Sequence, residues 1–129
     1  MSEKPTMRTP LARVRYLGSA HTGTTHFWRQ RLTSVAAIPL SIGLIVIVIF
    51  LLGRNHAATV QILGSPLVAI TMLLLVIVYA YHMWLGMQVI IEDYVHSDLK
   101  LTLLMANAFF SFTVAIACVY AIFKLSFGL

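Results

Sequence analysis

The sequence predicts an all-α membrane protein with three transmembrane helices, and two observations carry that prediction. Of its 129 residues, 60% are hydrophobic and only 10% are charged, and the mean hydropathy is +0.90. A soluble domain carries about 25% charged residues. In addition, three long intervals contain no Asp, Glu, Lys or Arg, namely 32–53, 55–91 and 101–123. Each is long enough for the roughly 20 apolar residues with which a helix crosses a bilayer.

Taken in order, the first element is a basic cytoplasmic arm, residues 1–25. It is rich in Thr, Ser, Gly and Arg, and this composition predicts irregular or weakly amphipathic structure. The membrane domain follows as residues 26–129. Its spans are predicted at about 32–53, 67–92 and 101–123. The polar stretch from Asn55 to Pro66 is interpreted as the outer turn, with Pro66 suited to the first position of the second helix. The string DYVHSDLK predicts a short turn before the third.

The basic residues predict the orientation of the spans. Seven of the nine flank the amino-terminal side of the first span or follow the second, whereas Arg54 and Lys124 lie at the opposite ends. Lys and Arg are enriched in cytoplasmic loops, so the amino terminus is predicted in the cytoplasm and the carboxyl terminus outside. A net charge of +5 therefore indicates contact with anionic lipid or an acidic partner, not with nucleic acid.

His82 is the most informative residue, because it lies inside the second predicted span. An ionisable or metal-binding group at membrane depth is costly in lipid and indicates function. A neutral imidazole can bind haem iron axially, although a six-coordinate iron needs a second ligand, which another subunit would supply. Gly86, one turn away, would let a flat group approach the backbone. The alternative is a buried structural histidine that is hydrogen-bonded to a neighbouring helix.

Asp93 and Tyr94 follow on the same helix. Eleven residues return Asp93 to within about 20° of His82, about 16 Å along the axis. A carboxylate near the carboxyl end of a helix is locally unfavourable, which favours a functional interpretation. Tyr94 can donate a hydrogen bond to a quinone carbonyl, and Asp93 can orient it or pass a proton. The alternative for Tyr94 is an aromatic-belt residue at the membrane surface.

Arg29 and Arg31 are predicted to enter the membrane at the same cytoplasmic level as Asp93. Their guanidinium groups can pair with that carboxylate or with haem propionates. The one cysteine, Cys118, supports neither an internal disulfide nor a cysteine-based iron–sulfur site.

At these residues the chain resembles a known family. The string HMWLGMQVIIEDYV (82–95) is similar to the signature of the small hydrophobic membrane anchor of succinate dehydrogenase, or respiratory complex II. In that family a histidine, a glycine four residues on, and an Asp-Tyr pair eleven and twelve residues on recur in the second of three helices. The segment RTPLARVRYLGSAHTGTTHFWRQRLTSVA (8–36) resembles the alphaproteobacterial branch. The chain lacks the opening typical of the companion cytochrome b subunit, which favours the hydrophobic anchor.

The resemblance implies a membrane anchor of a succinate:ubiquinone oxidoreductase in the bacterial inner membrane. It implies that His82 is an axial ligand of a haem b shared with the companion cytochrome b subunit. Tyr94 and Asp93 would line the ubiquinone site, and Arg31 would lie near the haem propionates. The chain would do no succinate chemistry itself but would hold an iron–sulfur subunit and a flavoprotein subunit to the membrane. Two alternatives remain: the anchor of a quinol:fumarate reductase, and a small structural or transport-complex membrane protein in which His82 only packs.

Overall fold

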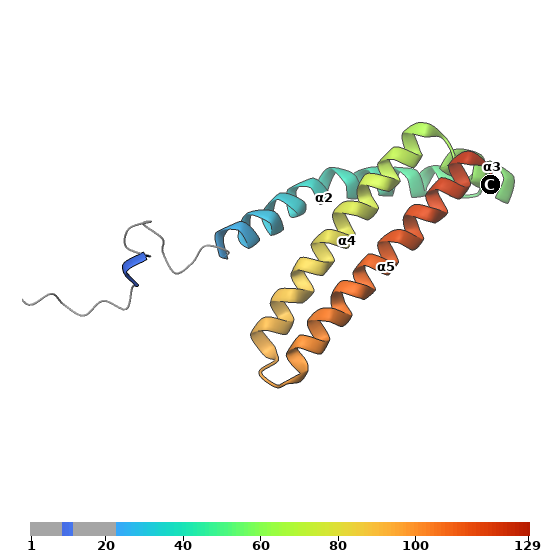
Figure 1. The fold of residues 1–129 in the computed structure, drawn as a ribbon. Helices are drawn as coiled ribbons and strands as arrows, with labels where there is room; N and C mark the ends of the chain where they lie inside the picture. The colour runs from blue at the N-terminus through green and yellow to red at the C-terminus, as the bar shows by residue number, and fades with distance from the viewer. Residues whose placement is uncertain (1–8, 12–22) are drawn as a thin grey trace, which may run out of the picture.

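The computed structural model describes residues 9–11 and 23–129, so the predicted arm at 1–25 lies almost entirely outside the described residues. The labelled elements are all helices, and the described residues contain no strand (Figure 1). Their bounds are α2 Gly23–Leu51, α3 His56–Leu63, α4 Pro66–Tyr94 and α5 Leu99–Phe127. The predicted all-α fold is confirmed.

Three of these helices are long and apolar enough to cross a membrane, as predicted: Thr24–Leu51, Pro66–Tyr94 and Leu99–Phe127. At about 1.5 Å per residue each is over 40 Å long, whereas the hydrocarbon core is about 30 Å thick. Each helix extends beyond its charge-free interval at one end or at both: the first at its start, the second at its end and the third at both ends. Arg29 and Arg31, for example, lie within the first three turns of α2, because Arg is a good helix former and this part can lie at headgroup depth.

The segment between the first two spans is not the simple turn that its polar residues predicted. It contains the additional helix α3, and the prediction was wrong on this point. Asn55 caps α3, since its side-chain oxygen accepts a hydrogen bond of 2.9 Å from the backbone N–H of Ala58. Ser65 then precedes α4, and Pro66 occupies the first turn of that helix as expected.

The central helix is α4, which packs against α2 and also against α5. Figure 1 shows α4 and α5 as neighbouring antiparallel helices, with α2 crossing α4. The α2–α4 contact is also antiparallel, because Thr33 meets His82 whereas Ser41, further along α2, meets Tyr79 earlier on α4. The start of α2 and the end of α4 thus lie toward the same side of the membrane.

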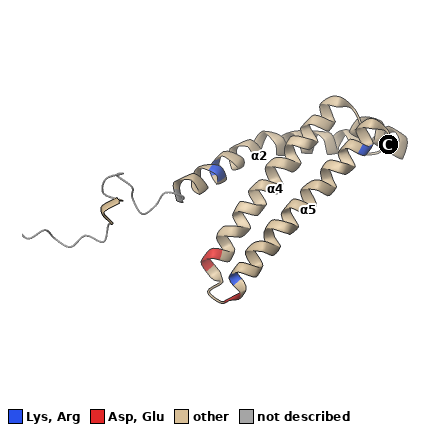
Figure 2. Ribbon diagram, viewed as in Figure 1, with Lys and Arg blue, Asp and Glu red and all other residues tan. Residues whose placement is uncertain are grey.

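Few side chains are buried by the chain alone. Among the described residues, Leu85 is only 2% exposed, whereas most apolar side chains of the three long helices face outward. The charged residues are found toward the helix ends, which leaves the middle of the helices uncharged (Figure 2). An apolar surface along the middle of three long helices is suited to contact with lipid tails or with the helices of a partner subunit.

Candidate functional site

His82 lies near the middle of α4 and contacts α2 through both nitrogens of its ring. The Nδ1 atom is 2.8 Å from the hydroxyl oxygen of Thr33, and the Nε2 atom is 3.4 Å from the side-chain nitrogen of Gln30. The ring is partly buried. Its partners come from a helix distant in sequence, so the position of this imidazole is fixed by the packing of α2 against α4.

Gly86 lies one turn beyond His82, and a side chain of α2 occupies the space that a side chain at this position would fill. A Cβ atom built at Gly86 would be 3.3 Å from Nε2 of Gln30, a tighter contact than most side chains make. The glycine therefore makes room for the Gln30 amide beside His82. The flat group expected next to this glycine would have to take the place of the amide.

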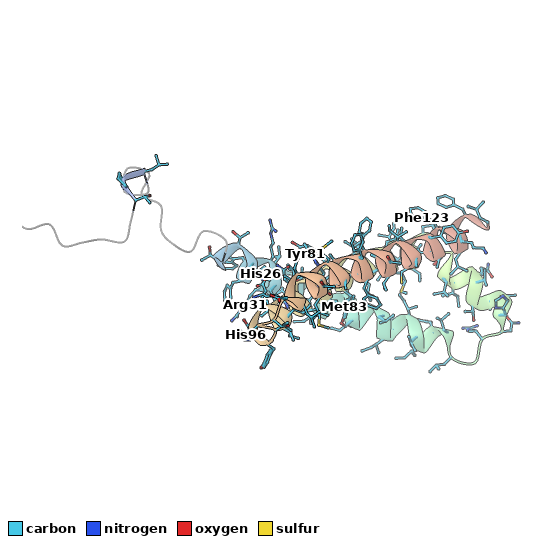
Figure 3. The ribbon with its side chains drawn as sticks, turned by 60° about the horizontal axis from the view of Figure 1, so that its bottom comes forward. His26, Arg31, Tyr81, Met83, His96 and Phe123 are labelled. Carbon is cyan, nitrogen blue, oxygen red and sulfur yellow. The ribbon has the colours of Figure 1, made fainter. Side chains whose placement is uncertain are left out.

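Within the part of the chain that the structure describes, two buried polar atoms on the same face of α2 have no hydrogen-bond partner. They are Nε2 of His26 and Oε1 of Gln30. Residues 26, 30 and 33 are spaced by four and three, so they form one stripe of the helix. Figure 3 shows His26 on α2 at the end of the molecule where Arg31 and His96 also lie. Because buried polar groups are normally paired, this stripe retains unused hydrogen-bonding capacity.

The donor set here suits a prosthetic group that brings most of its own ligands. Among the described residues, no three His, Cys, Asp or Glu side chains gather to hold a metal ion. A haem iron needs only axial ligands from protein, and a neutral imidazole is one of the common ones. His82 is a partly buried histidine near a glycine of α4, and it faces a stripe of α2 with unpaired polar atoms, so it fits that requirement.

Asp93 and Tyr94 form the last turn of α4, close to its end. Both are exposed, Tyr94 to 80%, and the described residues offer neither side chain a hydrogen bond or an ion pair. The structure does not bring them to His82, which is separated from them by three turns of helix. Two separate sites along α4 are therefore defined, one at mid-helix depth and one at the helix end.

The acidic residue next to Asp93 is held by its own neighbours. Gln88 donates to the carboxylate of Glu92 at 3.0 Å, and the Lys100 amine donates to the backbone carbonyl of Glu92 at 3.2 Å. A cation at the carboxyl end of a helix offsets the negative pole of the helix dipole. Lys100, at the start of α5, thereby reduces the local penalty that the acidic pair imposes on α4.

Neither predicted arginine forms an ion pair with Asp93 within the described part of the chain. Arg31 lies over the ring of Phe27, one turn earlier, with its guanidinium carbon 4.8 Å from the ring centre. Arg29 is exposed, and its backbone carbonyl accepts a hydrogen bond from Thr33. The expected pairing of these arginines with Asp93 therefore finds no support in the isolated chain.

The two residues that contact the His82 ring, Gln30 and Thr33, are not among those predicted from the sequence. A signal for them exists, because Gln30 and Thr33 are polar residues three positions apart where the first helix enters the membrane. The spacing places them on one side of α2. Only the packing of that side against α4 shows which residue they meet.

An apolar hollow of about 480 Å³ lies between α4 and α5. Tyr81 and Trp84 line it from α4, and Phe109 and Phe112 from α5, whereas His82 is not part of the lining. The hollow is almost wholly apolar, so it offers space for hydrocarbon but few groups for chemistry. The polar site is at the α2–α4 contact.

The fold and this contact define a class of protein: a small membrane protein with three long helices, whose central helix holds a histidine against the first. Comparison with known proteins assigns the family within that class. The chain belongs to the succinate dehydrogenase/fumarate reductase transmembrane subunit family, whose model matches residues 5–122.

Individual relatives agree with that assignment. The chain is 34% identical over 119 residues to the succinate dehydrogenase hydrophobic membrane anchor subunit of Rickettsia bellii (strain RML369-C), covering 90% of this chain and 94% of the relative. It is 29% identical over 120 residues to the protein of the same name from Paracoccus denitrificans, covering 93% of each. No solved structure matches the chain significantly. The resemblance to alphaproteobacterial anchor subunits that the motifs indicated is confirmed.

Proposed function

We propose that this chain is the hydrophobic membrane anchor of a succinate:ubiquinone oxidoreductase in the bacterial inner membrane. In this proposal His82 is one axial ligand of a haem b, and a companion cytochrome b subunit supplies the other. Tyr94 and Asp93 contribute to a ubiquinone site. The anchor also tethers an iron–sulfur subunit and a flavoprotein subunit, where succinate is oxidised.

The observation that carries the haem assignment is the position of His82. It lies inside a span, partly buried, with its ring held by Thr33 from another helix. A polar side chain at this depth is costly unless it is paired or used. When bound, haem b would supply one-electron transfer within the membrane. The task of this chain is then to hold one imidazole at a fixed depth and orientation.

Gln30 determines how the site opens. Its amide is beside Nε2 of His82 and in front of Gly86. The distance of 3.4 Å between the two nitrogens is longer than an ordinary hydrogen bond, and the amide oxygen has no partner among the described residues. Few interactions therefore oppose a rotation of this side chain, and in this proposal such a rotation would uncover Nε2 of His82.

The quinone assignment rests on the chemistry and exposure of Tyr94 and Asp93. Reduction of a quinone takes two electrons and two protons, so it needs a donor near water. Tyr94 is 80% exposed at the end of α4, and Asp93 has no partner among the described residues. Both are available to a ligand or a partner subunit at the membrane surface. Arg31 and Arg29 would support the same region, Arg31 from its place over Phe27.

The direction of the reaction is taken from the relatives. The family description covers both succinate dehydrogenase and fumarate reductase subunits, whereas the Rickettsia and Paracoccus relatives are named as succinate dehydrogenase anchors. Succinate oxidation with quinone reduction is therefore the proposed direction. Membership of this family also disfavours a purely structural or transport role.

The test is the substitution His82→Ala in the full complex. Haem content and the reduced-minus-oxidised spectrum of the purified complex are measured, together with the set of subunits that it retains. The variant is expected to lose or loosen its b-type haem while the anchor still inserts, because removing a buried polar side chain does not oppose insertion.

His56→Ala is the matched control, since His56 is an exposed histidine on α3. It should keep the normal haem content and spectrum. An unchanged spectrum in His82→Ala would rule out His82 as the ligand. Equal haem loss in both variants would show that the complex is merely sensitive to substitution.

A further inference from the structure

The hydrogens around Thr33 can be assigned from its neighbours. Its hydroxyl oxygen is 2.9 Å from the backbone carbonyl of Arg29 and 2.9 Å from that of Gln30. Carbonyl oxygens only accept, so the single hydroxyl hydrogen is directed to the backbone of α2. The third neighbour of the same oxygen is Nδ1 of His82, at 2.8 Å. With its hydrogen used, the hydroxyl offers lone pairs to that nitrogen.

From this arrangement we infer that Thr33 is a positioning residue, which accepts a hydrogen bond from Nδ1–H of His82 and keeps Nε2 unprotonated as the metal-ligating atom. A neutral imidazole carries one N–H, so a proton on Nδ1 leaves the lone pair of Nε2 free. The inference rests on the proposed haem ligation by His82. It adds how this chain selects the ligating nitrogen and fixes the rotation of the ring.

The hydrogen bond between Thr33 and His82 would also strengthen His82 as a ligand. A hydrogen bond from the second ring nitrogen makes a ligating imidazole more electron-rich and holds its orientation. In this structure the acceptor is itself fixed, because Thr33 is anchored to the α2 backbone through its own hydroxyl hydrogen. Thr33 thus links the position of α2 to the properties of an iron bound to α4.

Gln30 supplies the competing arrangement. If its amide were turned over, Oε1 would accept from a proton on Nε2 of His82, and Thr33 would donate to Nδ1. In that arrangement Gln30, and not Thr33, would select the tautomer, and Nε2 would be blocked. The two arrangements predict different effects for substitutions at residues 30 and 33, so they can be separated by mutation.

The test compares Thr33→Val, Thr33→Ser and Ser34→Ala in the full complex. Val keeps the shape of Thr and removes the acceptor, whereas Ser restores the hydroxyl. Ser34→Ala is the matched control, because Ser34 makes the same kind of bond to the Gln30 carbonyl, at 2.8 Å, but is exposed and, unlike Thr33, forms no hydrogen bond with His82. The measurements are the haem midpoint potential and the rate of haem loss to apomyoglobin.

Thr33→Val is expected to lose haem about 10- to 100-fold faster if the whole change in affinity appears in the dissociation rate, since a hydrogen-bond partner of a metal-bound histidine usually contributes that factor to affinity. Its midpoint potential should rise, because a less electron-rich imidazole stabilises ferric iron less. Thr33→Ser and Ser34→Ala should resemble the unsubstituted complex. Gln30→Ala is added to test the competing arrangement, and its midpoint potential should shift less than that of Thr33→Val, because in this inference Thr33 holds the Nδ1 proton of His82.

Each other result overturns the inference. Normal potential and haem loss in Thr33→Val would show that the hydroxyl does not act on the ligand. Equal shifts in Thr33→Val and Ser34→Ala would indicate a general disturbance of α2, and a shift in Gln30→Ala alone would assign the tautomer to Gln30. Failure of the proposed function is distinguishable, because His82→Ala would then keep its haem. If His82→Ala loses haem and Thr33→Val is normal, only the present inference fails.

Discussion

At the scale of single residues, the candidate haem ligand His82 and the candidate quinone-site residues Asp93 and Tyr94 lie at two depths of one helix, as their spacing predicted. His82 is held in the interior by Thr33, whereas Tyr94 is 80% exposed at the helix end. This separation matches two tasks with different needs. An axial ligand requires a fixed ring, and a donor to a quinone requires access to protons from water.

Tyr94→Phe tests the second task, because it removes one hydroxyl and keeps the ring. Quinone reduction is expected to slow roughly a hundredfold to a thousandfold if quinone chemistry limits turnover. This corresponds to a loss of roughly 2.7–4 kcal/mol, by analogy with donors to a developing oxyanion. Succinate oxidation with an artificial dye that accepts electrons upstream should persist. The two activities are measured side by side on the same preparation.

Asp93→Asn accompanies this test, since it keeps the size of the side chain and removes its charge. It should also reduce quinone activity and spare dye activity. Equal losses of both activities would identify an assembly defect. Unchanged quinone activity in Tyr94→Phe would mean that Tyr94 is an aromatic-belt residue, and the quinone-site proposal would fail.

At the scale of elements, the loop between the first two spans is a packed helix. The carboxyl end of α3 approaches the backbone of α5 at Gly64. A Cβ atom on Gly64 would be 2.8 Å from the carbonyl oxygen of Leu125 and 3.1 Å from that of Val60. Both are backbone atoms that cannot move aside alone. The glycine therefore sets the distance between α3 and α5.

Gly64→Ala is accordingly expected to destabilise the anchor by about 1–3 kcal/mol, the usual cost of overpacking. The measurement is the temperature at which the detergent-solubilised complex loses its anchor subunits. Gly43→Ala is the control, because its Cβ would meet only Thr71 at 3.4 Å, an ordinary contact. Equal stability of the two variants would contradict a close α3–α5 approach.

At the scale of the whole molecule, this chain covers little of its own apolar surface. Leu85 is nearly inaccessible, but most large apolar side chains of the long helices are exposed. Lipid can solvate such a surface, and so can the helices of a companion subunit. A haem that takes one ligand from this chain needs such a companion, so the proposed cofactor and the exposed surface lead to the same assembly.

The orientation of the anchor determines on which side of the membrane quinone chemistry would take place. The excess of Lys and Arg on one side predicts a cytoplasmic amino terminus and an external Leu129. The end of α4 with Tyr94 would then face the cytoplasm. A reporter that works only outside the cytoplasm is expected to be active when it is fused after Leu129. Activity of a reporter that works only in the cytoplasm would reverse the predicted orientation, and the proposed quinone site would then lie on the opposite side of the membrane.

The three long helices can be predicted from the amino-acid sequence alone, because a charge-free apolar run of about 20 residues has few other stable states and the bilayer requires an internally hydrogen-bonded backbone. The family can also be predicted from the sequence, through His82, Gly86, Asp93 and Tyr94 at their spacing along one helix. Helical periodicity relates residues of the same helix, and these four need no other element to be recognised.

The residues that face His82 could not be predicted in this way, because they depend on how α2 packs against α4. Gln30 and Thr33 lie about fifty residues earlier in the chain, and nothing in local periodicity pairs one stripe of α2 with a given register of α4. The same holds for α3, where the Asn55 cap and the contact at Gly64 favour a helix over the turn that polar residues indicated. Contacts between two helices depend on the shapes of both helix surfaces, whereas the local sequence pattern of one helix describes only its own surface.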